Sequence, residues 1–125
     1  MKIAKKMKIG IMSSKDFRQR TIDIAAGRYK PASSEPKIWF HSFKAMGEVL
    51  NDKNIELLKI IIEQKPESMT ELAQWSNRGI SNLSRTMKTL RAHKLVDVMV
   101  EGNVKKPIAR TATFAAENYV YNSAA

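Results

Sequence analysis

The strongest constraint on the fold of this chain is a series of apolar residues spaced three and four positions apart. The series consists of Ile80, Leu83, Met87 and Leu90. That spacing places the four side chains on one face of an α-helix, so the sequence predicts a helix whose apolar face belongs to a hydrophobic core and not to a ligand site. The polar run 76–79 directly before it predicts a short turn.

A second, shorter helix is expected immediately before that turn. Ser68 and Glu71 have the spacing of a capping box, in which both side chains accept hydrogen bonds from free backbone N–H groups. Leu72, Ala73 and Trp75 give this helix an apolar side. The stretch therefore predicts two helices joined by a tight polar turn.

The opposite face of the longer helix is polar and basic. At about 100° per residue, this face carries Arg78, Ser81, Asn82, Arg85, Lys88, Thr89 and Ala92. No Asp or Glu lies between Asn77 and Lys94. The face has the donors that bind phosphate oxygens and base edges in the DNA major groove, which indicates a nucleic-acid-binding helix. The alternative is a solvated surface helix with a basic bias.

The net charge of +10 is unevenly distributed along the 125 residues. Residues 1–30 carry a net charge of +7 and residues 76–110 a net charge of +6, whereas residues 31–75 carry −2. Clustered basic charge indicates a polyanionic partner. Nucleic acid is favoured over an anionic membrane, because no segment combines strong basicity with strong amphipathicity.

Composition narrows the class of protein. Hydrophobic residues make up 43% of the chain, which is enough to form the core of one domain. The absence of cysteine excludes disulfides, thiolate zinc sites and cysteine nucleophiles. No apolar run approaches the roughly 20 residues that cross a bilayer, and the basic start shows no secretory signal. We therefore expect a cytoplasmic protein that is not inserted in a membrane.

Catalytic and metal-binding patterns are missing from the sequence. His41 and His93 have no second histidine or carboxylate at metal-ligand spacing. The chain has no glycine-rich phosphate loop and no Gly-x-Ser-x-Gly elbow. Glu56, Glu63 and Glu67 are interpreted as the solvated side of a helix. We expect no enzyme activity, no catalytic residues, no cofactor and no metal.

The N-terminal third predicts a strand–helix–strand unit. The expected elements are a strand over 6–12, a helix over 15–26, a loop over 29–36 and a strand over 37–41. Ser13 or Ser14 can cap the helix, and Gly27 can end it. Its narrow apolar stripe consists of Phe17, Thr21, Ile24 and Ala25.

The middle of the chain predicts a central core helix. A short helix over 42–50 comes first, with Phe43, Met46 and either Val49 or Leu50 facing inward. Asn51 or Asp52 can cap the next helix, which runs over 53–64 and is ended by Pro66. It is apolar on most sides, through Ile55, Leu57, Leu58, Ile60, Ile61 and Ile62.

A hairpin is expected after the basic helix, with its turn near Gly102 and a returning strand over 105–114. A two-residue loop would set Val98 opposite Pro107. A three-residue loop would pair Val100 with Val104 and Val96 with Ile108, and it is favoured because it keeps apolar side chains together. A last edge strand is expected over 118–121.

This order of elements resembles a winged helix-turn-helix. Residues 52–110 resemble the DNA-binding part of MarR- and ArsR-type transcriptional regulators, with the likeness carried by 69–73, 82–90 and 94–96. The upstream stretch 38–42 resembles small antitoxin-like DNA-binding regulators. The chain lacks the long dimerising helices that flank a MarR-type core.

The resemblance implies an α+β, mainly helical fold: a winged helix-turn-helix with an N-terminal strand–helix–strand extension. Residues 1–41 would form the extension and the dimer contact, 42–114 the DNA-binding domain, and 115–125 an edge strand and tail. The implied DNA-binding residues are Thr70, Asn77, Arg78, Ser81, Asn82, Arg85, Lys88, Thr89, Lys105 and Lys106. The two lysines would contact phosphate or the minor groove, or else protect the hairpin edge.

The expected function is a sequence-specific regulator of double-stranded DNA. It would act as a homodimeric repressor that blocks polymerase. More narrowly, it would be the antitoxin of a toxin–antitoxin operon and would then bind a toxin protein. One alternative is a protein–protein interaction module, which would carry an apolar patch on the exposed helix face. The other is an RNA-binding module, which needs stacking rings. Tyr29, Trp39, Phe40 and the C-terminal tyrosines lie outside the basic face.

Overall fold

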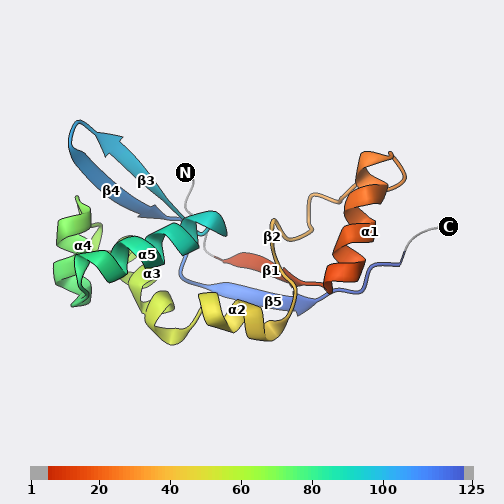
Figure 1. Ribbon diagram of the computed structural model, residues 1–125, viewed down its shortest axis with the longest axis horizontal. Coiled ribbons are helices and arrows are strands. Elements are labelled where there is room, and N and C mark those ends of the chain that lie inside the picture. The colour runs from red at the N-terminus through yellow and green to blue at the C-terminus, as the bar shows by residue number, and fades with distance from the viewer. Residues whose placement is uncertain (1–5, 123–125) are drawn as a thin grey trace. The chain divides into compact units, whose positions relative to one another are not determined.

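The computed structural model describes residues 6–122, and Figure 1 shows their α+β arrangement of helices and strands. The chain divides into two compact units. The first contains Val49–Thr113, and the second combines Met7–Glu48 with the C-terminal segment that begins at Phe114. No helix in the described residues is long and apolar enough to span a membrane.

The first unit consists of three helices followed by an antiparallel hairpin. The helices are α3 (Asp52–Gln64), α4 (Met69–Ser76) and α5 (Ile80–Ala92). The hairpin strands are β3 (Val96–Glu101) and β4 (Val104–Ala109). In Figure 1 the hairpin extends away from the helices, with its tip free.

Side-chain caps place the starts of α3 and α4 as the sequence predicts. The Asn51 side chain accepts a hydrogen bond from the Asn54 N–H at 2.9 Å. The Ser68 hydroxyl accepts one from the Glu71 N–H at 3.1 Å, and the Glu71 carboxylate reaches back to the Glu67 N–H at 2.7 Å. The bonds from the Asn54 and Glu71 N–H groups satisfy donors that a helix start leaves free, and the bond from Glu67 fastens the residue just before the Ser68 cap.

The core of the first unit confirms the expected apolar face of α5. Its fully buried side chains are Leu57, Leu58, Leu72, Leu83, Leu90, Leu95 and Val96, with Ile61 and Met87 nearly so. Two residues that were expected on the apolar sides of their helices are not buried, since Ile80 is 52% exposed and Trp75 is 42% exposed. Ile80 is the first residue of α5, and α4 is so short that Leu72 is its one buried residue.

The hairpin adopts the two-residue loop, so the favoured longer loop is wrong. Glu101 pairs with Val104, and Val98 lies opposite Pro107. Gly102 has a φ of 62°, which glycine supplies at the first central position of a tight hairpin turn without steric cost. Val100 is 63% exposed, so pairing it with another apolar residue at the tip would bury little surface.

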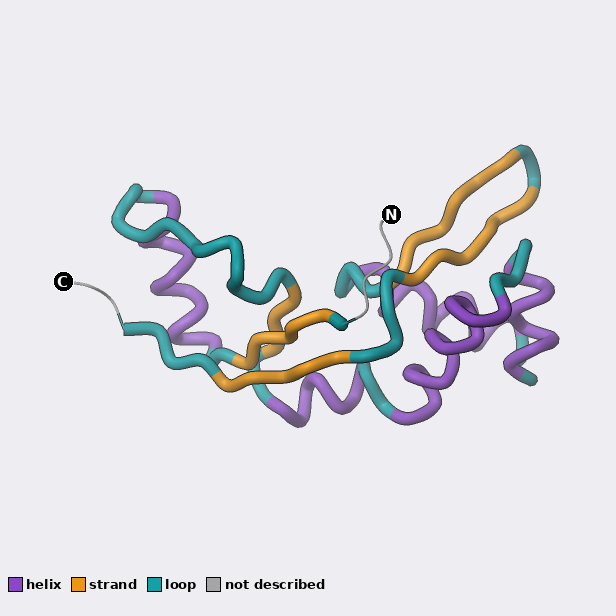
Figure 2. The backbone as a smooth tube through the Cα atoms, turned by 180° about the vertical axis from the view of Figure 1, so that it is seen from behind, coloured by secondary structure: helices purple, strands orange, loops and turns teal. Residues whose placement is uncertain are grey.

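The second unit contains a three-stranded parallel sheet. Its central strand is β1 (Met7–Ile11), which pairs with β2 (Ile38–Phe40) on one side and β5 (Phe114–Asn118) on the other. Helix α1 (Ser14–Ala25) connects β1 to β2, and α2 (Phe43–Val49) follows. Figure 2 traces the loop that leads from the hairpin into β5.

The sequence predicts the first two strands and α1 correctly, with Ser13 as the cap of α1. The predicted bounds of the C-terminal strand are wrong. It begins at Phe114, which was expected in the returning strand of the hairpin, and it ends at Asn118, where the edge strand was expected to begin. The pairing with β1 decides these bounds, since Met7 lies opposite Phe114 and Ile11 opposite Asn118.

Helix α1 buries charge where an apolar stripe was expected. Its buried residues are Arg20 and Asp23, whereas Thr21 and Ala25 are exposed. In α2, Phe43 is 52% exposed and does not face inward as predicted. Helix α1 and all of α2 but Val49 belong to the smaller unit, in which the buried apolar residues lie mainly in the sheet.

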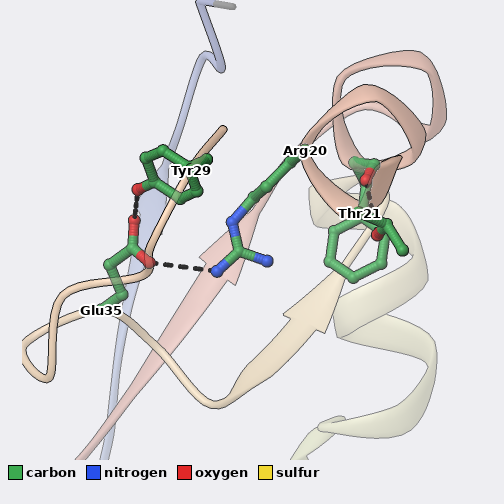
Figure 3. A network of polar contacts seen from close by, with 5 residues as sticks. Arg20, Thr21, Tyr29 and Glu35 are labelled. Atoms are coloured by element: carbon green, nitrogen blue, oxygen red, sulfur yellow. Dashed lines mark hydrogen bonds and ion pairs between the residues drawn. The ribbon is translucent and has the colours of Figure 1, made fainter. Parts of the chain in front are cut away.

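A hydrogen-bonded network surrounds the buried guanidinium of Arg20. Figure 3 shows Arg20 and Tyr29 directed at the carboxylate of Glu35, with an Arg20–Glu35 distance of 3.0 Å. The guanidinium also stacks on the Trp39 ring, 4.9 Å from its centroid. Paired and stacked in this way, the charge avoids the cost of uncompensated burial. Burial alone would raise the pKa of the Glu35 carboxyl. The hydrogen bonds from Tyr29 and Arg20 outweigh this effect and lower the pKa below its ordinary value of 4.5.

The C-terminal segment is fastened to α1 through Asp23. The Tyr121 hydroxyl donates to the Asp23 carboxylate at 2.6 Å, and Gln19 and Arg28 each donate to the other oxygen at 3.0 Å. The hydrogen bond to Asp23, followed by burial, raises the pKa of Tyr121 to about 12. The Tyr121 N–H also donates to Asp16 at 3.2 Å.

Candidate nucleic-acid interface

The buried side of α5 determines which residues its outer face exposes. Leu83 and Leu90 are fully buried and Met87 is 4% exposed, which fixes the rotation of the helix about its axis. The exposed residues that this leaves on the outer face are Ser81, Asn82, Arg85, Lys88 and Thr89. These five predicted site residues therefore share one surface, as the helical periodicity indicates.

An arginine and an amide lie side by side on that surface. The Arg85 guanidinium donates a hydrogen bond to the Asn82 side-chain oxygen at 2.6 Å. One turn further on, the Thr89 hydroxyl donates to the backbone carbonyl of Arg85 at 3.2 Å, so this hydroxyl is already engaged within the helix. Asn82 and Arg85 thus present several donors together, whereas Lys88 adds an exposed point charge.

Arg78 has a different position from the other predicted site residues. Its guanidinium donates to the Lys53 carbonyl at 2.6 Å and to the Asn54 side-chain oxygen at 3.3 Å. Asn54 in turn donates to the Val49 carbonyl at 2.9 Å. Arg78 therefore fastens the turn before α5 to the first turn of α3, and its guanidinium is engaged by acceptors of the protein itself.

A groove of about 700 Å³ lies between α3 and α5. Lys53 and Glu56 line it from α3, and Asn82 and Arg85 line it from α5. The sequence interpretation did not include Lys53 in the site. The apolar residues Leu57, Leu58 and Ile61 fix the rotation of α3, so a helical projection from them was the signal that could have placed Lys53 outside the buried face.

A second hollow of about 600 Å³ lies at the turn between α4 and α5. Its lining includes the predicted residues Thr70 and Asn77, together with Gln74 and Ile80, which were not predicted. Asn77 ends α4 with a φ of 57°. The cap of α5 is Gly79, which has no side chain to bond the first N–H groups of that helix. These N–H groups and the helix dipole favour an anion at this end of α5.

The two hairpin lysines are placed differently. Lys105 is exposed, whereas Lys106 is half-buried with its ammonium 3.6 Å from the Glu67 carboxylate. Neighbouring residues in a strand point to opposite faces, so the two side chains cannot act as one patch. Lys105 is the hairpin cation left to solvent, and the charge of Lys106 is partly offset.

The sequence of the first unit also identifies a family. The sequence model of the family described as HVO_A0114 matches residues 49–114, which is more than half of the chain. The chain belongs to the HVO_A0114 family. The HVO_A0114 match contains α3, α4, α5 and the hairpin, and so it covers every residue of the candidate interface. No curated protein matches the chain in sequence.

Proposed function

We propose that this HVO_A0114 family protein is a sequence-specific regulator that binds double-stranded DNA through a winged helix-turn-helix. The observation that carries the proposal is the outer face of α5, where Asn82, Arg85 and Lys88 are exposed and acidic residues are missing from Asn77 to Lys94. In this proposal α4 contacts the backbone, α5 enters the major groove, and the β3–β4 hairpin is the wing.

Each group on the proposed surface has a distinct role. Arg85 can donate two hydrogen bonds to O6 and N7 of guanine, and the Asn82 amide can pair with adenine. The hydrogen bond between them aligns the two side chains before DNA arrives. Phosphate would bind at the N-terminus of α5, where N–H groups lack a side-chain cap. Lys105 would bind a second phosphate, and Arg78 would hold α5 in place.

The proposed biological action is repression by a homodimer. Two copies of α5 in successive major grooves would occupy the promoter and exclude polymerase, with no chemical step. A toxin partner, and with it an antitoxin role, rests only on the resemblance of residues 38–42 to antitoxin-like regulators. Identification of a toxin-sized reading frame beside the gene, followed by co-purification of the two products, tests that narrower role.

The proposal is tested by measuring affinity for a selected duplex and for a random duplex. We expect Arg85→Ala to lower affinity for the selected duplex by about 5- to 150-fold, corresponding to about 1–3 kcal/mol, and to change random binding far less. Lys105→Ala should weaken both duplexes alike and reduce the salt slope by about one phosphate contact. Lys59→Ala, which removes an exposed lysine from α3, is the matched control and should change neither.

The outcome also separates base contacts from backbone contacts. Equal weakening of both duplexes by Arg85→Ala would make Arg85 a phosphate contact and leave base reading to Ser81 and Asn82. Affinity that does not depend on salt would contradict DNA binding altogether, because phosphate contacts release counterions.

A protein-binding module is the second candidate function. Trp75 and Ile80 expose large apolar side chains near the α4–α5 turn, and Ile80 lines the hollow there. Exposed apolar groups of this kind occur at protein–protein contacts. A duplex-binding assay separates the two candidates, since a module of this type would show no salt-dependent affinity for DNA.

A further inference from the structure

The outer edge of β5 differs from the other strand edges of the described residues. Strand β4 carries Lys105, Lys106 and Pro107, and β3 carries Asp97 and Glu101. Lysine, other charges and proline are the common means by which proteins prevent an edge strand from pairing with another chain.

Strand β2 is also protected. It has three residues, and Pro36 and Lys37 come immediately before it. Strand β5 has five residues, Phe114–Asn118, with no lysine or proline and with Glu117 as its single charge, and its last three residues are exposed. Among the described edge strands of more than three residues, β5 carries the fewest charges, because β3 has two acids and β4 has two lysines and a proline.

The hydrogen bonds to β1 show which backbone groups of β5 are free. The Tyr119 N–H donates to the Ile11 carbonyl at 2.7 Å, so the odd-numbered residues of this segment direct their backbone groups toward β1. The even-numbered residues of the segment direct both their N–H and their C=O groups away from β1, because backbone groups alternate sides along a strand. The outward groups therefore belong to Phe114, Ala116 and Asn118.

We propose that this edge pairs with the same edge of a second copy of the chain, antiparallel and centred on Ala116. The two sheets would then form one continuous sheet across a two-fold axis. Ala116 would face its own counterpart, Phe114 would face Asn118, and Ala115 would face Glu117. The strand suits a second copy because the small Ala116 side chains meet at the axis and the Glu117 carboxylates do not face each other. This inference specifies the homodimer of the proposed function, but the pairing itself does not depend on DNA.

Charge at the central position tests the pairing. We expect the full chain to have about twice the 14.2-kDa chain mass in light scattering after size exclusion. Ala116→Lys alone and Ala116→Glu alone place like charges opposite each other, so each variant should have the mass of a monomer. An equal mixture of the two should recover the dimer mass, because lysine then faces glutamate. This recovery also shows that both variants fold.

Val104→Lys is the matched control, since it adds the same charge at an exposed strand position of the hairpin and should remain a dimer. A monomeric wild-type chain, a dimeric Ala116→Lys variant, or a mixture that stays monomeric would overturn the proposal. Duplex affinity measured on the same samples distinguishes this failure from that of DNA binding. A dimer that ignores DNA refutes only the proposed function, and a monomer that binds DNA refutes only the β5 pairing.

Discussion

Replacing Gly10 with alanine tests the packing of the Trp39 ring against the backbone of β1. A Cβ at this position would lie 2.2 Å from Cζ3 and 2.3 Å from Cε3 of the Trp39 ring. Such distances are far below van der Waals contact, so either the ring or β1 must move. The ring is held by Phe17 and Tyr119, with centroids at 6.0 and 5.3 Å, and by the Arg20 guanidinium.

The cost of this change follows from the surroundings of the ring. Forcing additional atoms into a packed core typically costs about 1–3 kcal/mol, and we expect Gly10→Ala to lie in that range. For a chain of this length, each kcal/mol corresponds to roughly 4 °C in Tm. Urea denaturation measures the free energy of unfolding directly, and thermal denaturation gives the matching loss in Tm.

A double-mutant cycle with Trp39→Phe isolates the steric cause. Phenylalanine lacks the second ring of the indole, which contains the atoms closest to Gly10, so Gly10→Ala should cost much less in that background. Gly47→Ala is the control, because its added Cβ meets no atom within 4 Å and alanine favours helix α2. A steric clash with the indole is excluded if Gly10→Ala costs the same with tryptophan and with phenylalanine at position 39, or costs no more than Gly47→Ala.

Two further predictions concern the pH dependence of stability in the second unit. Because the folded state lowers the pKa of Glu35, its stabilisation is present above about pH 4.5 and is lost as the pH falls through the lower folded value. Glu35→Gln should flatten this acid limb in urea denaturation, and an unchanged acid limb would contradict the Arg20–Glu35 pairing. The effect of Tyr121 has the opposite pH dependence, because folding raises the pKa of this phenol. The stability that it contributes is present below pH 10 and is lost as the pH rises toward about 12. Tyr121→Phe should remove the corresponding phenolate step from an absorbance titration, whereas a step that persists near pH 12 belongs to another tyrosine.

Local sequence signals predict the first unit well. Helix α5 follows from the spacing of Leu83, Met87 and Leu90, and the starts of α3 and α4 follow from the caps at Asn51 and Ser68. These signals involve neighbours within one helical turn, so they are visible in the chain itself. The same periodicity correctly places Ser81, Asn82, Arg85, Lys88 and Thr89 on the exposed side of α5.

Contacts between distant residues account for what the sequence did not predict. Arg78 lies in phase with the outer face of α5, but carbonyl and amide acceptors at the start of α3 bind its guanidinium. The segment 114–118 has no alternating pattern, and its strand is defined by β1 from the other end of the sequence. The burial of Arg20 likewise requires Glu35 and the surrounding rings, which periodicity in α1 cannot reveal.

The return of β5 to the N-terminal strand imposes an order on folding. Met7 pairs with Phe114, so the second unit encloses the first within the sequence and has a high contact order. The helices and hairpin of the first unit are contiguous in the sequence and make mostly local contacts, and we infer that they fold first. A chain that ends after the hairpin would keep α5 but lose β5 and the Tyr121 attachment. Premature termination would therefore leave β1 with an unpaired edge, a form of the chain prone to aggregation.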